Sequence, residues 1–276
     1  MRTVTPLVFS HANSFGAATY GVLFEALKAR RFDVAAIDKY GHDPRYPVSN
    51  NWPHLVQQLI DFTRQRVDNA GAPVFLAGHS LGGFLSLMAA SQAPNLVRGV
   101  LLLDAPLVGG WRAQALGLAK RTQLVGSVSP GKLSRKRRQY WPNFEAALAH
   151  FKSKRAFAKW HPQVLEDYIA HGTHDETVNG NTQRVLSFNR DIETAIYNTL
   201  PSNLEALIKR HPVKCPVAFI GGTRSSEMRQ VGLELTRRVT QGRLMMLDGS
   251  HLFPMEKPLV TAAAIEAALL NLQNLG

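Results

Sequence analysis

The chain has 276 residues, a length that suits one α/β domain with an insertion and is short for two large independent cores. Its apolar fraction of 45% excludes an intrinsically disordered protein, and no run of eighteen apolar residues predicts a membrane-spanning helix. The formal net charge is +12, so the position of the basic residues bears on the choice of partner.

The first hundred residues alternate between strand-like and helix-like patterns. Residues 1–10 hold no apolar stretch long enough for an export signal, which favours a cytoplasmic protein. Apolar runs predict strands at residues 4–9, 32–37, 73–77 and 97–103. Helical spacing predicts helices at residues 17–30, at 81–90, and from an Asn50 or Asn51 N-cap to about 69–71. This alternation indicates a parallel sheet covered on both faces.

The pattern changes between residues 106 and 212, where no comparable strand is predicted. Helical candidates lie at residues 143–157, 162–171 and 204–210. We interpret this interval as a helical insertion within the α/β unit. The alternation then resumes with predicted strands at 217–220 and 244–247 and predicted helices at 228–239 and 259–275.

Most of the positive charge lies in this insertion. Between Trp111 and Trp160, twelve basic residues stand against the single acidic residue Glu145. Such a segment could meet an anionic substrate group, an anionic partner or a membrane surface. We expect a solvated helical face instead, because Lys and Arg side chains are usually exposed. The run 135–138 beside Tyr140 and Trp141 is likewise assigned to a solvated helix, and no nucleic-acid partner is expected.

A serine motif lies between a predicted strand and a predicted helix. Residues 78–83 read Gly-His-Ser-Leu-Gly-Gly and contain the pattern G-x-S-x-G, whose glycines permit a sharp turn that lifts the serine hydroxyl above the sheet edge. The helix N-terminus adds N–H groups that favour negative charge on a substrate oxygen. We predict that Ser80 is a nucleophile and that His79 is a packing residue.

A histidine loop follows the last predicted strand. Residues 248–258 read Asp-Gly-Ser-His-Leu-Phe-Pro-Met-Glu-Lys-Pro. Together with the serine motif, this loop resembles the α/β-hydrolase superfamily, in particular serine hydrolases of the esterase and lipase kind with a helical cap. The resemblance covers the chain outside the insertion and implies that His251 is the general base. It also implies a core at 1–105 and 213–276, a cap at 106–212, and about six mostly parallel strands, because the chain starts at what resembles the family's third strand.

The loop after the first strand matches the place where this family keeps an oxyanion donor. Residues 11–16 read His-Ala-Asn-Ser-Phe-Gly. The resemblance implies an oxyanion hole made by the backbone N–H groups of Ala12 or Asn13 together with that of Leu81. Haloalkane dehalogenases also carry an Asn here, but their nucleophile is Asp, so Ser80 argues against dehalogenation.

The acid of the expected triad is not fixed by the pattern. The family's usual acid loop reads Gly-Gly-Thr-Arg-Ser-Ser-Glu at residues 221–227 and contains no Asp. Glu227 is one candidate. Asp104 is the other, at the end of the predicted strand 97–103, where lipases of the pancreatic type place their acid. We favour Asp104 slightly, because it leaves the sheet edge one strand beyond the serine.

These residues predict hydrolysis of a carboxylic ester or thioester through an acyl-Ser80 intermediate. The substrate would be a small acyl compound, and a homodimer is compatible with the sequence. Neither a metal-ligand spacing nor a nucleotide-binding motif is found, so no metal and no cofactor are expected. Cys215, the single cysteine, is expected to be a small buried apolar residue. The alternatives are a serine-dependent carbon–carbon hydrolase or lyase, a transferase or haloperoxidase-like relative, and a non-catalytic small-ligand receptor.

Overall fold

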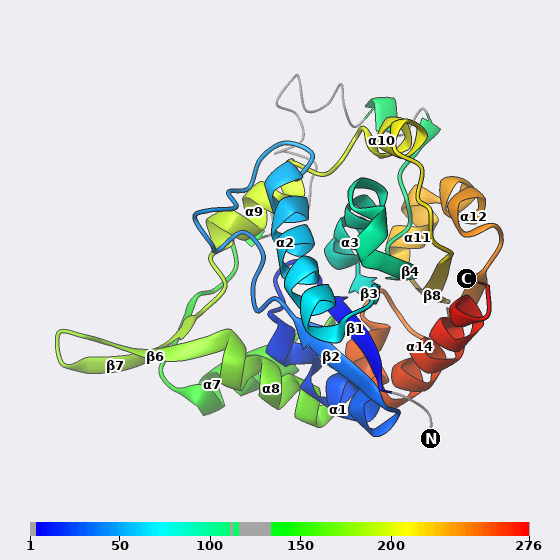
Figure 1. Ribbon diagram of the computed structural model, residues 1–276. Helices are drawn as coiled ribbons and strands as arrows, with labels where there is room; N and C mark the ends of the chain where they lie inside the picture. Colours follow the sequence, from blue (N-terminus) through cyan, green and yellow to red (C-terminus); the bar gives the residue numbers. More distant parts are fainter. Residues whose placement is uncertain (1–3, 111–112, 116–133, 276) are drawn as a thin grey trace.

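The computed structural model describes residues 4–110, 113–115 and 134–275. Its centre is a six-stranded sheet in which all neighbouring strands are parallel, in the order β2-β1-β3-β4-β8-β9 (Figure 1). The strands are β1 (Thr5–Ser10), β2 (Phe32–Ala36), β3 (Val74–His79), β4 (Val97–Leu103), β8 (Val217–Gly222) and β9 (Leu244–Leu247). The sheet predicted from the apolar runs is therefore confirmed.

Helices cover both faces of this sheet. Alternate residues of β1 point to opposite faces, so that Leu7 and Phe9 belong to one apolar cluster and Val8 to the other. One face carries α1 (Gly21–Ala29) and α14 (Pro258–Gln273), and the other carries α2 (Pro53–Ala70) and α3 (Leu81–Gln92), as Figure 1 shows. The chain thus has the two-sided core that a parallel sheet requires.

Three short helices lie in the C-terminal part of the chain, two of them between β8 and β9 and one between β9 and α14. They are α11 (Ser226–Val231), α12 (Glu234–Thr240) and α13 (Phe253–Glu256). The single helix predicted at 228–239 is wrong, because the chain turns at Gly232, where φ is 78°. The N-cap predicted at Asn50 or Asn51 is also wrong. Trp52 occupies that position, and the Asn51 side chain instead accepts a hydrogen bond from the Ser202 N–H at 3.0 Å.

The interval between β4 and β8 contains strands as well as helices. Its helices are α7 (Phe144–Lys152), α8 (Pro162–Gly172), α9 (Arg190–Asn198) and α10 (Leu204–Arg210). A second sheet joins β5 (Tyr140–Trp141), β7 (Asn181–Leu186) and β6 (Thr173–Val178) in antiparallel order. The prediction that this interval lacks strands is therefore wrong.

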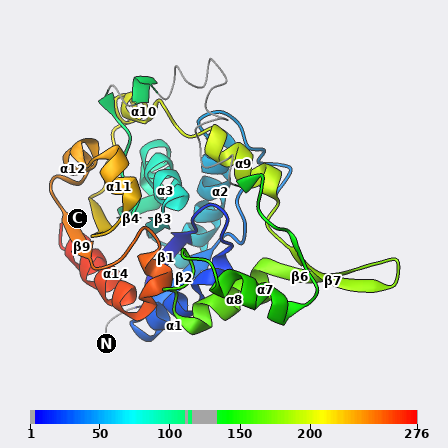
Figure 2. The ribbon, with the colours of Figure 1, turned by 180° about the vertical axis from the view of Figure 1, so that it is seen from behind.

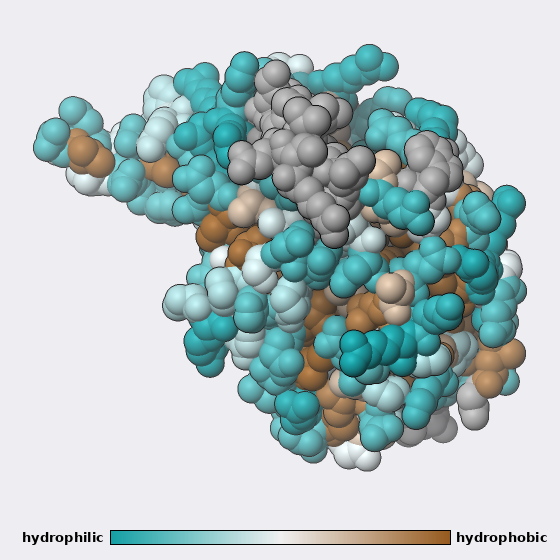
Figure 3. Space-filling model, turned by 90° about the horizontal axis from the view of Figure 1, so that it is seen from above, coloured by the Kyte–Doolittle hydropathy of each residue, from teal (hydrophilic) through white to brown (hydrophobic). Residues whose placement is uncertain are grey.

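Strands β6 and β7 form an arm that extends away from the rest of the molecule (Figures 1 and 2). The arm turns at Asn179 and Gly180, whose φ angles of 52° and 80° are the left-handed values of a two-residue hairpin turn. Its residues are mostly exposed and hydrophilic, and it lies to the left in Figure 3. The Asn-Gly pair was the local signal from which this hairpin could have been predicted.

Within the described residues, no helix is both long enough and apolar enough to cross a bilayer.

Cys215 is half-buried and packs against the cluster that contains α2 and α3. Burial raises the pKa of its thiol to about 11, so this cysteine is not a reactive thiolate.

Candidate active site

Ser80 lies in a tight turn between β3 and α3. Its backbone angles are φ 52° and ψ −115°, a strained conformation for a residue with a side chain. A Cβ at Gly78 would overlap the backbone of Gly82, and a Cβ at Gly82 would overlap that of Ser10, so glycine is required at both positions. The Ser80 N–H donates to the Leu103 carbonyl at 2.9 Å, which ties the turn to β4. This is the geometry that the G-x-S-x-G pattern predicts.

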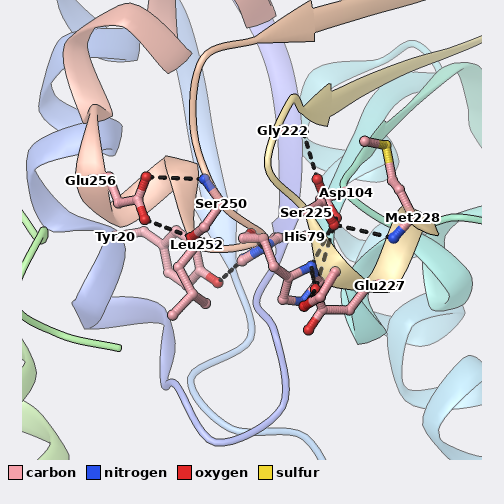
Figure 4. Close-up of polar contacts among 12 residues, drawn as sticks. Tyr20, His79, Asp104, Gly222, Ser225, Glu227, Met228, Ser250, Leu252 and Glu256 are labelled. Carbon is pink, nitrogen blue, oxygen red and sulfur yellow. Dashed lines mark hydrogen bonds and ion pairs between the residues drawn. The ribbon is translucent and has the colours of Figure 1, made fainter. Parts of the chain in front are cut away.

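His251 follows β9 and reaches the buried end of β4. Its Nδ1 lies 2.9 Å from Oδ1 of Asp104, whose side chain is 0% exposed. The Asp104 carboxylate also accepts hydrogen bonds from the Gly222 N–H and the Ser225 hydroxyl, each at 2.6 Å (Figure 4). Nδ1 therefore donates to Asp104 and Nε2 remains an acceptor. Among the hydrogen bonds of the described residues, none joins Ser80 to this imidazole, although both side chains line one cavity.

The Asp104–His251 contact shifts both pKa values away from ordinary ones. Burial alone would raise the pKa of Asp104, but the hydrogen bonds from His251, Gly222 and Ser225 lower it. Burial alone would lower the pKa of His251, but the hydrogen bond to Asp104 and the negative charges of Glu227 and Asp104 raise it. The pair therefore favours an ionised Asp104 and a more basic imidazole.

Glu227 lies near the same imidazole without a hydrogen bond to it. Its Oε2 is 3.9 Å from His251 Nδ1, and its side chain is 43% exposed. The same oxygen accepts a hydrogen bond from the Ser226 hydroxyl at 2.8 Å, while the Ser225 hydroxyl, 3.4 Å away, donates to Asp104 instead. Of the two carboxylates considered from the sequence, Asp104 lies within hydrogen-bonding distance of His251 Nδ1 and Glu227 does not.

A chain of buried hydrogen bonds joins the loop after β1, the serine turn and the histidine loop. The Ala12 N–H donates to the Tyr20 hydroxyl at 3.0 Å, and this hydroxyl lies 2.8 Å from His79 Nδ1 (Figure 4). His79 Nε2 lies 2.8 Å from the His251 carbonyl. Burial lowers the pKa of His79 to about 3, with a further contribution from the charge of His251, so His79 is neutral and accepts at one nitrogen while donating at the other. His79 therefore positions the His251 loop in addition to packing.

The same chain of contacts corrects one expected oxyanion donor. The Ala12 N–H is already bonded to Tyr20, so it does not point into the cavity. Asn13 and Leu81 both line the cavity, and Leu81 is the first residue of α3, where N–H groups have no acceptor within the helix. His11 holds the loop: its Nδ1 donates to the Ala12 carbonyl at 2.8 Å and its Nε2 accepts from the Tyr40 N–H at 3.1 Å.

A buried carboxylate in α9 holds the other side of this loop. Glu193 accepts from the Ser14 hydroxyl at 2.5 Å and from Arg137 Nη1 at 2.7 Å, and its carbonyl accepts from the Asn13 side chain at 3.0 Å. Arg137 also donates to the Tyr168 hydroxyl at 2.6 Å. Residues 135–138 form a turn and irregular chain, and Arg137 is only 20% exposed, so the expected solvated helix is wrong. Sequence analysis offered no sign of Glu193, because its partners lie far away along the chain.

Glu256 positions the histidine loop from its other end. Its carboxylate accepts hydrogen bonds from the Ser250 hydroxyl at 2.5 Å and the Ser250 N–H at 3.1 Å (Figure 4). The Leu252 N–H in turn donates to the Ser250 hydroxyl at 3.1 Å. These contacts give a physical reason for the glutamate in the motif at residues 248–258.

Comparison with known proteins identifies the family of this chain. The family model described as "Alpha/beta hydrolase family" matches residues 7–264. The chain belongs to the α/β-hydrolase family. The match includes both the serine turn and the histidine loop, so it extends over the whole candidate site.

Individual members of the α/β-hydrolase family are similar to this chain at low identity. A monoglyceride lipase homolog of monkeypox virus is 29% identical over 178 residues, which cover 58% of this chain and 62% of that protein. The chain therefore spans less than two thirds of this relative. A serine hydrolase-like protein of Dictyostelium discoideum is 24% identical over 87% of this chain and 68% of its own length. The solved structure of an E-2-(acetamidomethylene)succinate hydrolase has a TM-score of 0.70 at 22% identity, covering 97% of this chain and 92% of that one. This last likeness shows the α/β-hydrolase fold alone.

The cavity of this α/β-hydrolase has a volume of about 330 Å³. Ser80 and His251 meet there with side chains from the long interval between β4 and β8, namely Ile196, Tyr197 and Leu200. Within the residues that the structure describes, the one group of side chains that could hold a metal ion is Asp104, Glu227 and His251, whose ligand atoms lie within 4.8 Å of one another. The hydrogen bond from His251 to Asp104 already accounts for this grouping.

Proposed function

We propose that this chain is a serine hydrolase that cleaves a carboxylic ester or thioester through an acyl-Ser80 intermediate. The observation that carries the proposal is the 2.9 Å hydrogen bond from His251 Nδ1 to the buried Asp104, beside a cavity that Ser80 also lines. A carboxylate in this position fixes the imidazole tautomer and stabilises the imidazolium that forms during catalysis. His251 is then the general base and Asp104 the acid of the triad.

In the proposed first step, Ser80 Oγ attacks the carbonyl carbon and its proton passes to His251 Nε2. The negative charge on the carbonyl oxygen is held by the N–H groups of Leu81 and Asn13, both in the cavity wall. Collapse of this intermediate expels the alcohol or thiol, which takes the proton from His251. In the second step water attacks the acyl carbon and gives a proton to His251. Collapse of this intermediate breaks the bond to Ser80 Oγ and releases the acid, and Ser80 takes the proton back from His251.

The names of the relatives support this choice of chemistry. One is called a monoglyceride lipase homolog and another a serine hydrolase-like protein. We assign residues 106–212 to a cap over the serine, because this interval contributes Ile196 and Tyr197 of α9, and Leu200 after it, to the cavity wall. A small acyl compound is the substrate that fits a cavity of about 330 Å³.

A fluorophosphonate probe tests the proposal, because it reacts with activated serine hydroxyl groups. We expect labelling of Ser80 alone in the native chain and no labelling in Ser80→Ala. Ser86→Ala is a matched control, because Ser86 lies in α3 after the same turn and its buried hydroxyl has no hydrogen-bond partner among the residues that the structure describes. Labelling that survives in Ser80→Ala, or hydrolysis of p-nitrophenyl esters that is unchanged there, would place the site elsewhere.

A further inference from the structure

The charge of the cavity wall differs from that of the whole chain. The net charge of the chain is +12, yet the described residues that line the cavity include the carboxylates Asp104 and Glu227 and neither Lys nor Arg. Asp104 is fully buried and receives three hydrogen bonds, one of them from His251. The negative charge of Asp104 is therefore stabilised by neighbouring groups of the site.

Glu227 is the second carboxylate in the cavity wall, and among the described residues it forms no ion pair with a Lys or Arg. Its hydrogen-bond donor is the hydroxyl group of Ser226, and its distance of 3.9 Å from His251 Nδ1 exceeds a hydrogen bond. Hydroxyl donors orient a carboxylate but do not cancel its charge. Figure 4 shows Glu227 near Asp104, in the first turn of α11, whose N-cap is Ser225.

Three of the described basic side chains form ion pairs with carboxylates other than Glu227. Arg137 pairs with the buried Glu193, while Arg224 and Lys257 both pair with Asp248. These three side chains are therefore held by carboxylates other than Glu227, and none of them pairs with Glu227 at the cavity.

The cavity wall also contains three aromatic rings, those of Trp52, Phe84 and Tyr197. The Trp52 and Phe84 rings lie nearly perpendicular, at 85°, with centroids 6.1 Å apart. The faces of aromatic rings attract cations, most strongly when the cation is a weakly hydrated ammonium group. The rings and Glu227 therefore favour the same sign of charge in a ligand.

We infer that the cavity selects esters that carry a positively charged ammonium group, through Glu227 and the aromatic wall, and discriminates against anionic esters. The preference among esters rests on the proposed ester hydrolysis. The preference in ligand binding does not depend on it. One unit charge within several ångströms of a half-exposed carboxylate should change kcat/KM by on the order of tenfold. The basic segment at 111–160 then does not serve to attract an anionic substrate.

Three p-nitrophenyl esters with six-carbon acyl chains test the order of preference. One ends in a trimethylammonium group, one in a methyl group and one in a carboxylate. We expect kcat/KM to decrease in that order, by about tenfold at each step. In Glu227→Gln the three values should converge, whereas Glu205→Gln should keep the native order. Glu205 is a matched control, because its side chain is 41% exposed, compared with 43% for Glu227, and it pairs with Arg238.

Binding to Ser80→Ala separates this inference from the proposed function. Calorimetry should give a lower Kd for hexyltrimethylammonium than for hexanol, and a higher one for hexanesulfonate. If the native chain hydrolyses no ester, the proposed function fails, yet this binding order still decides the inference. Equal or reversed affinities, or an ester preference that persists in a folded Glu227→Gln variant, would overturn it.

Discussion

Asp104→Asn keeps the shape of a fully buried side chain and removes its charge. The carboxylate accepts hydrogen bonds from Gly222, Ser225 and His251 at 2.6, 2.6 and 2.9 Å, and an amide has one oxygen to offer them. If that oxygen accepts from Gly222, the amide N–H groups face the imidazole, which must then present an unprotonated Nδ1. The proton moves to Nε2, the nitrogen that should receive the Ser80 proton.

The expected loss of activity follows from this wrong tautomer. In the serine protease triad the same change lowers kcat by on the order of 10⁴, and we expect a similar decrease here. The variant should also lose about 1–3 kcal/mol of stability at neutral pH, because a buried donor loses its acceptor. The lowered pKa of Asp104 means that its contribution is present above the pKa of the unfolded chain and disappears as the pH falls, so the stability difference should shrink in acid.

The assay is kcat for a p-nitrophenyl ester, with thermal melting to show that each variant folds. Glu227→Gln is the comparison. Glu227 lies 3.9 Å from the imidazole and is 43% exposed, so its removal should change kcat for a neutral ester by less than about tenfold. A folded Asp104→Asn enzyme with near-normal kcat, beside a severely impaired Glu227→Gln enzyme, would refute the assignment of the acid.

Two further predictions concern pH and the buried ion pair. His251 must be unprotonated to act as a base and its pKa is raised, so kcat/KM should fall with decreasing pH around a midpoint above 6.5. Because the charge of Glu227 contributes to the raised pKa, Glu227→Gln should move this midpoint to lower pH. An unmoved pH–rate profile would contradict the electrostatic role of Glu227. Glu193→Gln leaves Arg137 without its buried partner and should lower the free energy of unfolding by about 3 kcal/mol in urea titrations. Asp175→Asn removes the exposed partner of Arg184 and should lower the free energy of unfolding by less than about 1 kcal/mol. Equal losses in the two variants would show that burial does not strengthen the Arg137–Glu193 pair.

The parts of the site that depend on local pattern could be predicted from the sequence. The glycines around Ser80 follow one another along the chain, and each is required by contacts that a strand-to-helix turn creates. The loop of His251 likewise carries its own support in Glu256, six residues from Ser250. Contacts between residues that are close together in the chain produce a characteristic motif spacing, which can be recognised in the sequence.

The proposed acid could not be fixed in this way, because its contacts are distant along the chain. Asp104 lies 147 residues from His251 and 118 from Gly222, and only the sheet order brings them together. The sequence therefore left Glu227 as a competitor. Glu193 was missed for the same reason, since 179 residues separate it from Ser14.

The arm was missed for a different reason. Its residues are exposed on both sides, so β6 and β7 lack the apolar alternation from which strands are usually recognised. The turn at Asn179 and Gly180 carried the signal instead. Arg137 was misassigned because a run of basic residues gives no indication of which member is buried.

The central claim is that an acyl group passes through Ser80, and intact-protein mass spectrometry after rapid acid quench tests it most directly. With p-nitrophenyl acetate in excess, the chain should gain the mass of one acetyl group within the first turnover, and peptide mapping should place that group on Ser80. His251→Ala should accumulate little of this species, because the serine is not activated. An acetyl group on another residue, or steady hydrolysis without any acylated protein at the shortest quench times, would contradict the account.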